Sequence, residues 1–436
     1  MTKNNFTIRS IPFALAIFFV FLPVFSFALV NEEGVDKFRK SVNSILSNNC
    51  LRKNNYGVKI YSLDRGETLY EIRSKQLFIP ASNAKVLTTA VALKYLGSNY
   101  RFSTEFYTDG ILENETLKGN LYIKGSGDPK LVTEQLWLIV NELRNLPIKK
   151  IKGNIIADDS FFDNQKRIKT WIKNPGAQAY EAPLGALSFN FNTVKVYVSP
   201  GGKVGDRPKI VIEPENEYIK LENNAQTLRP GKRRRLIVNR VDKEDHDLIT
   251  VSGGINIGQP RAHYFLNITN PTQYALSVFK SYIDLSGITF DGQLQRGKVP
   301  DDAMELYIHE SEPLALALRG LNKFRNNFVA EQILKTIGGE HFGLPGSTKK
   351  GLRVFEEYMK ELGYEPRQYS IYDGSGLSRQ NRLSPKIIVD ILRNVKDDLS
   401  VYPEFVTALG VMGVDGNVKN RMRKVASSSK ARVKTG

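Results

Sequence analysis

The chain is poor in residues that could hold a fold together covalently or bind a metal. It has one cysteine, Cys50, and four histidines among 436 residues. A single thiol cannot form a disulfide within the chain, and the histidines show neither metal-ligand spacing nor a recognisable triad motif. The sequence therefore predicts no disulfide, no metal site and no cofactor, and we expect surface or core roles for His246, His263, His309 and His341.

Long hydrophobic runs are scarce as well. The clearest one, residues 11–25, follows Lys3 and Arg9 and leads into Ser26-Phe27-Ala28, which has the small-x-Ala pattern of a cleavage site. Its length of about 15 residues falls short of the ~20 residues with which a helix crosses a bilayer. We expect residues 1–28 to be an export signal that is cleaved after Ala28, and the mature protein to be periplasmic.

Acidic residues are too few to balance the basic ones. The chain has 62 Lys and Arg against 45 Asp and Glu, a formal charge of +17, of which Lys3 and Arg9 supply two. Such a surplus suits anionic partners. The sequence has no basic helix and no basic stripe interleaved with aromatics, so we expect no nucleic acid partner. An anionic wall or membrane surface is the alternative partner for a peripheral contact. Residues 232–235 either form such a contact patch or are a solvated loop tip. Nothing in the sequence indicates the oligomeric state.

Residues 78–97 contain the feature on which the functional prediction depends. Ser82 and Lys85 follow Pro80 at a predicted first helical turn, and apolar residues then cover nearly every face of the helix, which is typical of a buried element. Positions i and i+3 lie on one side of a helix, so the Lys85 amine can reach the Ser82 hydroxyl. The positive end of this helix faces the place where an oxyanion would form.

A serine can attack a carbonyl when a base takes its proton. A lysine is such a base when burial and nearby cations keep it partly neutral, so Ser82 and Lys85 supply nucleophile and base together. On its own, Ser-x-x-Lys occurs by chance in many chains, and a solvated helix start with Ser82 as N-cap is the alternative. The rest of the sequence decides between these readings.

The remaining pattern has helical ends around a strand-rich middle. Residues 35–51 have helical spacing, and residues 56–63 and 67–71 alternate like the strands of a hairpin. We expect strands at 121–124, 155–157, 194–198 and 209–212, and helices at 135–143, 271–285, 314–321, 328–337, 348–362 and 385–395. This order predicts one α/β core interrupted by an inserted β-rich module.

Two elements typical of penicillin-recognising serine enzymes are present, Ser82-x-x-Lys85 and a terminal Lys434-Thr435-Gly436. Five segments narrow the resemblance: PASNAKVLTTAVALKYLGSNYRF, GSGDPKL, GALSFNFNTVKVYVSPG, NKFRNNFVAEQILK and DGSGLSRQNRLSP. From about residue 35 to its end, the chain resembles the low-molecular-mass class C penicillin-binding proteins, the D-alanyl-D-alanine carboxypeptidase/endopeptidase family (peptidase S13).

The resemblance implies an α/β fold in which a transpeptidase- or β-lactamase-like domain, an antiparallel sheet flanked by helices, is split by nested β-rich domains. The catalytic domain would comprise residues 29–97 and 313–436. The insertion would comprise residues 98–312, with a third domain nested at about 195–260.

The family's Ser-x-Asn element is altered in this chain. The matching positions are Arg325, Asn326 and Asn327, so the asparagine is kept and the serine is replaced by arginine. The tripeptide Ser188-Phe189-Asn190 has the right letters, but it runs into the predicted strand at 194–198 within the insertion, and we reject it as catalytic.

The arginine changes the expected chemistry. A serine hydroxyl both donates and accepts, whereas a guanidinium only donates and cannot relay a proton to a leaving amine. The charge of Arg325, next to Lys434, would favour a neutral Lys85 and could bind a substrate carboxylate. Either a slower enzyme or a site that binds but barely turns over would result.

By resemblance, Lys434 offers charge to the substrate's terminal carboxylate, Thr435 a hydroxyl, and Gly436 lies beside the oxyanion hole. In such enzymes the hole uses the backbone N–H of the nucleophile and that of the residue after this glycine. No residue follows Gly436 and the expected closing strands and helix are missing, so we expect a truncated sequence; in a complete one, the missing donor would cost about 10²–10³ in rate. Asp158 either meets the amine of a stem-peptide diamino acid or caps a turn, and the glycine-rich loop at 373–378 is expected near the cleft.

We therefore predict a serine D-Ala-D-Ala carboxypeptidase/endopeptidase that acts on peptidoglycan stem peptides and is inhibited by β-lactams. Ser82 would attack, Lys85 would take its proton, Asn327 would position the substrate amide and Lys434 its carboxylate. One alternative is a catalytically weakened wall-binding or regulatory pseudo-peptidase, favoured by Arg325 and by the chain end. The other, a β-lactamase, is disfavoured because the long segment between Lys85 and Asn327 does not fit the compact architecture of that group.

Overall fold

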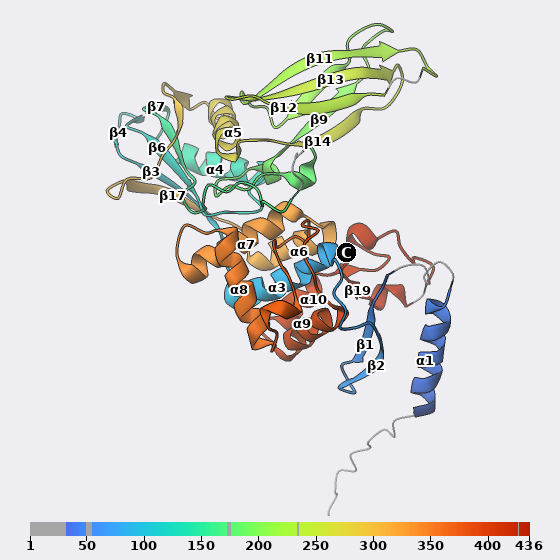
Figure 1. Cartoon of the computed structure of the whole chain (residues 1–436). Coiled ribbons are helices and arrows are strands. Elements are labelled where there is room, and N and C mark those ends of the chain that lie inside the picture. Colours follow the sequence, from blue (N-terminus) through green and yellow to red (C-terminus); the bar gives the residue numbers. More distant parts are fainter. Residues whose placement is uncertain (1–31, 49–54, 172–175, 233–234, 426) are drawn as a thin grey trace, which may run out of the picture. The chain divides into compact units, whose positions relative to one another are not determined.

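The computed structural model describes residues 32–48, 55–171, 176–232, 235–425 and 427–436 (Figure 1). The predicted export signal, Cys50 and residues 233–234 of the basic run lie outside the described residues. The chain divides into two units, Met1–Asn55 and Tyr56–Gly436. The first contains helix α1 (Glu32–Leu46), which confirms the helical pattern from residue 35 as far as Leu46. None of the described helices is long and apolar enough to cross a membrane.

Helix α3 (Ala84–Tyr95) is at the centre of the helical part of the second unit (Figure 1). Every residue from Ala84 to Leu93 is buried, as apolar positions on nearly every face predicted. Helix α3 contacts five others: α6 (Leu314–Phe324), α7 (Asn327–Phe342), α8 (Thr348–Glu361), α9 (Pro385–Asp397) and α10 (Tyr402–Ala408). Together they bury one hydrophobic cluster, which includes Leu87, Ile333 and Phe355.

A single 3₁₀ turn, η1 (Ala81–Asn83), precedes α3, so Ser82 stands in this tighter turn and not in the α-helix itself. Ala81 has a φ of 46°, in the left-handed region that residues with a Cβ seldom adopt. The predicted helical turn is thus confirmed in position but differs in type. It sets Ser82 at the entrance of α3, one turn before Lys85.

Two antiparallel strand pairs accompany these helices. Strand β1 (Val58–Ser62) pairs with β2 (Glu67–Ile72), which confirms the predicted hairpin. Strand β18 (Gly410–Val411) pairs with β19 (Arg432–Val433), which ends one residue before Lys434. The antiparallel sheet implied by the resemblance is therefore present in the described residues as two separate two-stranded pieces.

Between α3 and α6 the chain forms sheets with strand orders β16-β8-β6-β3-β17, β15-β7-β5-β4, β10-β9-β14 and β11-β13-β12, with helices α4 and α5 beside them (Figure 1). The strands are β3 (Ser103–Thr108), β4 (Ile111–Glu113), β5 (Thr116–Lys118), β6 (Leu121–Gly125), β7 (Lys150–Lys152), β8 (Ile155–Asp158), β9 (Thr193–Ser199), β10 (Lys209–Glu213), β11 (Ile219–Leu228), β12 (Ile237–Asp242), β13 (Asp247–Asn256), β14 (Ala262–Asn267), β15 (Thr289–Phe290), β16 (Leu294–Arg296) and β17 (Met304–Glu310). The helices are α4 (Thr133–Asn145) and α5 (Pro271–Leu285). All the predicted strands and helices of this region are confirmed, and their apolar faces form a second hydrophobic cluster.

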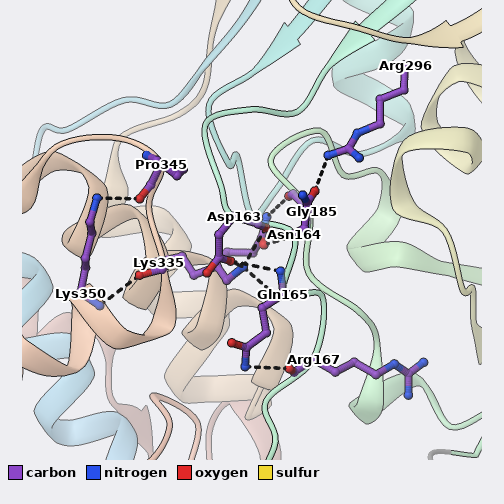
Figure 2. A network of polar contacts seen from close by, with 11 residues as sticks. Asp163, Asn164, Gln165, Arg167, Gly185, Arg296, Lys335, Pro345 and Lys350 are labelled. Atoms are coloured by element: carbon purple, nitrogen blue, oxygen red, sulfur yellow. Dashed lines mark hydrogen bonds and ion pairs between the residues drawn. The ribbon is translucent and has the colours of Figure 1, made fainter.

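Helix α7 carries polar side chains that bind this inserted region. Lys335, which is 1% exposed, donates to Asp163 Oδ1 at 2.6 Å and to the carbonyl of Gln165 at 2.8 Å (Figure 2). Gln332 Nε2 donates to the carbonyl of Gly185 at 2.9 Å. Partly buried hydrogen bonds thus join the insertion to α7, the helix that begins at Asn327 of the altered motif.

Candidate active site

Ser82 and Lys85 form a hydrogen-bonded pair at the entrance of α3. Lys85 Nζ lies 3.3 Å from Ser82 Oγ. Ser82 is 7% exposed and Lys85 is fully buried. The i, i+3 spacing predicted this contact. A hydroxyl and an amine are thus held together in nearly dry surroundings.

Lys85 Nζ has two further acceptors. It lies 2.8 Å from Asn327 Oδ1 and 2.6 Å from the carbonyl oxygen of Ser375, in the loop predicted near the cleft. An ammonium can donate to all three oxygens. A neutral amine can donate its two N–H groups to Asn327 and Ser375 and direct its lone pair toward Ser82. The arrangement therefore accepts both protonation states without moving the nitrogen.

Burial brings the pKa of the Lys85 amine close to neutrality. Desolvation of the ammonium lowers the pKa to about 8, the carboxylates of Glu331 and Asp373 raise it, and the nearby charge of Arg325 lowers it. A fraction of Lys85 is therefore uncharged at neutral pH, as a general base requires.

Asn327 is the first residue of α7, and the helix start orients it. The side chain of Asn326 caps the helix by accepting from the backbone N–H of Val329 at 3.2 Å. Asn327 Nδ2 donates to the carbonyl of Tyr180 at 3.2 Å, which leaves Oδ1 facing Lys85. Tyr180 belongs to the short turn η2 (Ala179–Glu181) of the insertion, so the insertion helps to orient this amide.

Arg325 is the C-cap that directly follows α6, and its φ of 59° is again in the left-handed region. Its side chain is exposed, and no described residue forms a hydrogen bond or ion pair with it. Its charge lowers the pKa of both Lys85 and Lys434. A guanidinium without an anionic partner among the described residues thus stands beside the two lysines.

Lys434 is the third cation of the site. Burial lowers its pKa to about 7, and repulsion from Lys85 and Arg325 adds to this shift. Its Nζ donates to the backbone carbonyl of Thr435 at 2.6 Å. The amine is therefore only partly charged at neutral pH until an anion approaches it.

Thr435 and Gly436 follow β19 toward the start of the site. Thr435 Oγ1 accepts from Asn417 Nδ2 at 3.0 Å. A β-carbon built on Gly436 would lie 3.0 Å from Asn83 Nδ2 and 3.1 Å from the carbonyl of Pro80. The Lys-Thr-Gly segment thus runs past the turn that holds Ser82.

Two other sequence candidates have structural contacts. Asp158 is buried, and its carboxylate accepts from the backbone N–H groups of Ser160 and Val299, both at 2.9 Å, as a turn-capping aspartate does. Ser188 Oγ donates to the carbonyl of Gly185 at 2.7 Å and accepts from Asn192 Nδ2 at 2.9 Å within the insertion, beside the turn η3 (Asn190–Asn192). No contact joins either residue to Ser82, among the residues that the structure describes.

Two buried carboxylates, Glu331 and Asp373, act on Lys85, and the sequence predicted no functional role for either side chain. Asp373 accepts from Trp171 Nε1 at 3.0 Å and Asn381 Nδ2 at 2.7 Å, and Glu331 accepts from loop backbone. The signals available were an acidic residue inside the apolar helix at 328–337 and an Asp at the start of the glycine-rich loop. Within the described ranges, no group of three or more His, Cys, Asp or Glu is arranged to hold a metal ion.

The model of the D-Ala-D-Ala carboxypeptidase 3 (S13) family matches residues 38–436. A serine–lysine pair inside an α/β fold with inserted sheets agrees with this class of serine peptidases. The match spans most of the chain, so the chain belongs to the D-Ala-D-Ala carboxypeptidase 3 (S13) family. The resemblance stated from the sequence is thereby confirmed.

Curated relatives carry the same activity in their names. The chain is 29% identical over 425 residues to the D-alanyl-D-alanine carboxypeptidase of Actinomadura sp. (strain R39), covering 94% of this chain and 78% of the relative. It is 24% identical over 377 residues to the D-alanyl-D-alanine carboxypeptidase DacB of Haemophilus influenzae (84% and 76%). It is 25% identical over 423 residues to the penicillin-sensitive carboxypeptidase A of Dictyostelium discoideum (91% and 80%).

Solved structures with the same fold include penicillin binding protein 4 from Haemophilus influenzae. That chain superposes with a TM-score of 0.74 at 24% identity, covering 84% of this chain and 80% of the other. The same protein complexed with a β-lactam superposes with a TM-score of 0.70 at 23% identity, with the same coverage. The predicted fold class is confirmed.

Proposed function

We propose that the chain is a serine D-Ala-D-Ala carboxypeptidase/endopeptidase that acts on peptidoglycan stem peptides through an acyl-enzyme on Ser82. The observation that carries the proposal is the 3.3 Å contact between Lys85 Nζ and Ser82 Oγ in a buried setting. The family and the names of the relatives support the substrate class. The export-signal pattern of residues 1–28 supports action in the periplasm.

The acylation step follows from the contacts of Lys85. The neutral amine donates to Asn327 and to the Ser375 carbonyl, and its lone pair accepts the proton of the Ser82 hydroxyl. Ser82 Oγ then bonds to the carbonyl carbon of the penultimate D-Ala, the peptide C–N bond breaks, and the departing amine takes up a proton. Water afterwards attacks the ester, which releases the shortened peptide and restores Ser82.

Lys434 and Arg325 are proposed to recognise the substrate's terminal carboxylate. No described carboxylate forms an ion pair with either residue. A carboxylate arriving beside Lys434 favours its ammonium form, because an opposite charge raises the pKa of an amine. Substrate binding would thus restore a charge that the free site suppresses, while Thr435 contributes its hydroxyl and Asn327 meets the substrate amide.

The second candidate is a catalytically weakened wall-binding or regulatory pseudo-peptidase. It is favoured by Arg325, whose guanidinium cannot accept and return a proton as a serine hydroxyl would. The formal charge of +17 supports a peripheral contact with an anionic wall or membrane surface for either an enzyme or a pseudo-peptidase.

Labelling with a fluorescent penicillin tests the acylation step, because a β-lactam amide would be opened by the same nucleophile. We expect a stable covalent adduct in the wild type and none in Ser82→Ala. Ser74→Ala, which removes a buried hydroxyl that donates to Glu71, should label like the wild type. Release of D-Ala from a pentapeptide should likewise occur in the wild type and in Ser74→Ala and be lost in Ser82→Ala.

A folded wild-type chain that takes no label would contradict the proposal and favour the pseudo-peptidase. An adduct that forms and hydrolyses rapidly would instead favour a β-lactamase.

A further inference from the structure

Glu331 is a fully buried carboxylate for which the proposed reaction has no use. It lies on α7 one turn after Asn327. Its Oε2 accepts from the backbone N–H of Gly374 at 3.0 Å and its Oε1 from that of Ser375 at 2.8 Å. Both oxygens of the side chain are thus committed to two consecutive backbone amides of the loop at 373–378.

The carbonyl groups of the same two loop residues are held by α3. The carbonyl of Gly374 accepts from Thr88 Oγ1 at 2.6 Å, and the carbonyl of Ser375 accepts from Lys85 Nζ at 2.6 Å. Residues 374–375 are therefore clamped by hydrogen bonds from two sides, with Glu331 on one side and Lys85 on the other. Only such charge-assisted hydrogen bonds offset the free-energy cost of burying a carboxylate. Their loss would leave the cost of desolvating Glu331 uncompensated.

We propose that Glu331 is a positioning residue: through the backbone of residues 374–375 it holds the Ser375 carbonyl against the Lys85 amine and so aims that amine at Ser82. This inference rests on the proposed acylation chemistry. It adds an acidic side chain of α7 to the groups that determine how fast Ser82 is acylated, although Glu331 touches neither the nucleophile nor the substrate.

The charge of Glu331 opposes its geometry, because it favours the ammonium form of Lys85 and not the neutral base. The groups that face it are Lys85 of α3, Asp373 of the loop and Lys335 of α7, and Arg325 acts on Lys85 from the end of α6. Burial and the repulsion from Asp373 raise the pKa of Glu331, and the bonds from Gly374 and Ser375 lower it. In its ionised form Glu331 raises the pKa of Lys85. The two groups therefore titrate as a coupled pair.

Two substitutions distinguish the effect of the length of the Glu331 side chain from the effect of its charge. Glu331→Asp keeps the charge but shortens the side chain by one methylene, so it cannot hold both loop amides. Glu331→Gln keeps the shape but has one acceptor oxygen in place of two, and it removes the charge. The matched control is Thr336→Val on the same helix, which removes a buried hydroxyl whose bond goes to the carbonyl of Gln332 within the helix.

Three measurements on the full chain test the inference: the rate of acylation by a penicillin, its dependence on pH, and hydrogen exchange of the Gly374 and Ser375 amides. In both Glu331 variants we expect acylation to slow by at least about tenfold and the exchange of the two amides to quicken by about tenfold. In Glu331→Gln the pH midpoint of acylation should also fall by about one unit, because Lys85 loses a charge that favours its ammonium. Thr336→Val should change none of the three.

The inference is overturned if both Glu331 variants show the same amide exchange and the same acylation rate as Thr336→Val. If the wild type itself is not acylated, the proposed function fails, and hydrogen exchange alone then decides on Glu331. Faster exchange at residues 374–375 in both variants than in Thr336→Val would still support the clamp, and equal exchange would overturn it.

Discussion

At the scale of single residues, three basic side chains lie in the site around the Ser82 hydroxyl. Lys85, Arg325 and Lys434 repel one another, and this repulsion adds to burial in lowering the pKa of both lysines. A site with this composition carries less than its formal charge when empty and gains charge when an anion enters. In the proposed mechanism, the same property would provide a neutral base in Lys85 and a binding site for the substrate carboxylate at Lys434 and Arg325.

Arg325→Ser tests the role of the altered motif. We expect D-Ala release from a pentapeptide to rise about 10- to 100-fold, because a serine hydroxyl can pass a proton to the leaving amine and a guanidinium cannot. The pH midpoint of acylation should move upward, since removing Arg325 removes a charge that lowers the pKa of Lys85. Initial rates measured across the pH range give both quantities. Arg319→Ser, the same change at an exposed position of α6, is the control.

If Arg325→Ser folds as the wild type does and releases D-Ala no faster, the account of this arginine is wrong.

The sequence predicted those site residues that can be recognised from their neighbours in the chain. Ser82 and Lys85 are one turn apart, and Asn327 is recognisable from its helix, so their side chains could be named before their contact was seen. The carbonyl groups of Tyr180 and Ser375 could not be named, because every residue has a backbone carbonyl and only tertiary packing selects two of them. The catalytic roles of the named residues stay predictions.

At the scale of elements, the loop at 373–378 packs directly on the turn η1 that holds Ser82. Gly376 has a φ of +81°, and a β-carbon built on it would lie 1.8 Å from the carbonyl oxygen of Ala81. No side chain can occupy that space without displacing the backbone next to Ser82. A glycine is required here both by conformation and by close approach.

Gly376→Ala is expected to lower the free energy of unfolding by about 2–5 kcal/mol, from left-handed strain and overpacking together. It should also abolish penicillin labelling, because the turn that carries Ser82 must move. Gly363→Ala is a sharp control, since Gly363 has a φ of +80° but no atom within 4 Å of the added carbon. It should cost about 1–2 kcal/mol and keep labelling.

Urea denaturation and labelling of the two variants measure these effects. Normal labelling of Gly376→Ala would contradict the close packing of loop and turn.

The elements themselves were largely predictable, but their pairing was not. Helix α5 has the predicted bounds, because apolar spacing starts at a proline and continues to Leu285. That β6 and β8 pair in parallel, or that β11 lies beside β13, depends on contacts far apart in the chain. Strand spacing alone contains no information on such partners.

At the scale of the whole second unit, the insertion and α7 share an ion pair between a buried lysine and a partly exposed aspartate. Lys335 is 1% exposed, and Asp163 supplies the carboxylate that neutralises it (Figure 2). Burial lowers the pKa of Lys335 and Asp163 raises it, so the ammonium depends on this partner.

Asp163→Ala should lower the free energy of unfolding by about 1.5–3 kcal/mol, because it leaves a buried ammonium with carbonyl acceptors alone. The double variant Asp163→Ala/Lys335→Met should be more stable than the single one, since it also removes the buried charge. Glu113→Ala, which breaks the exposed pair with Lys118, should cost less stability than Asp163→Ala, because solvent screens an exposed ion pair. Urea denaturation of the four chains, wild type included, would contradict this view if Asp163→Ala and Glu113→Ala cost the same.

The polar face of α7 limits how far this protein could be shortened. A minimal chain in which a linker replaced residues 98–312 would take away the acceptors of Gln332 and Lys335 and the carbonyl that orients the amide of Asn327. Engineering such a miniature would require apolar substitutes at the first two positions and a new anchor for the third. Excision alone would leave Gln332 and Lys335 without these hydrogen-bond acceptors and the amide of Asn327 without the contact that orients it.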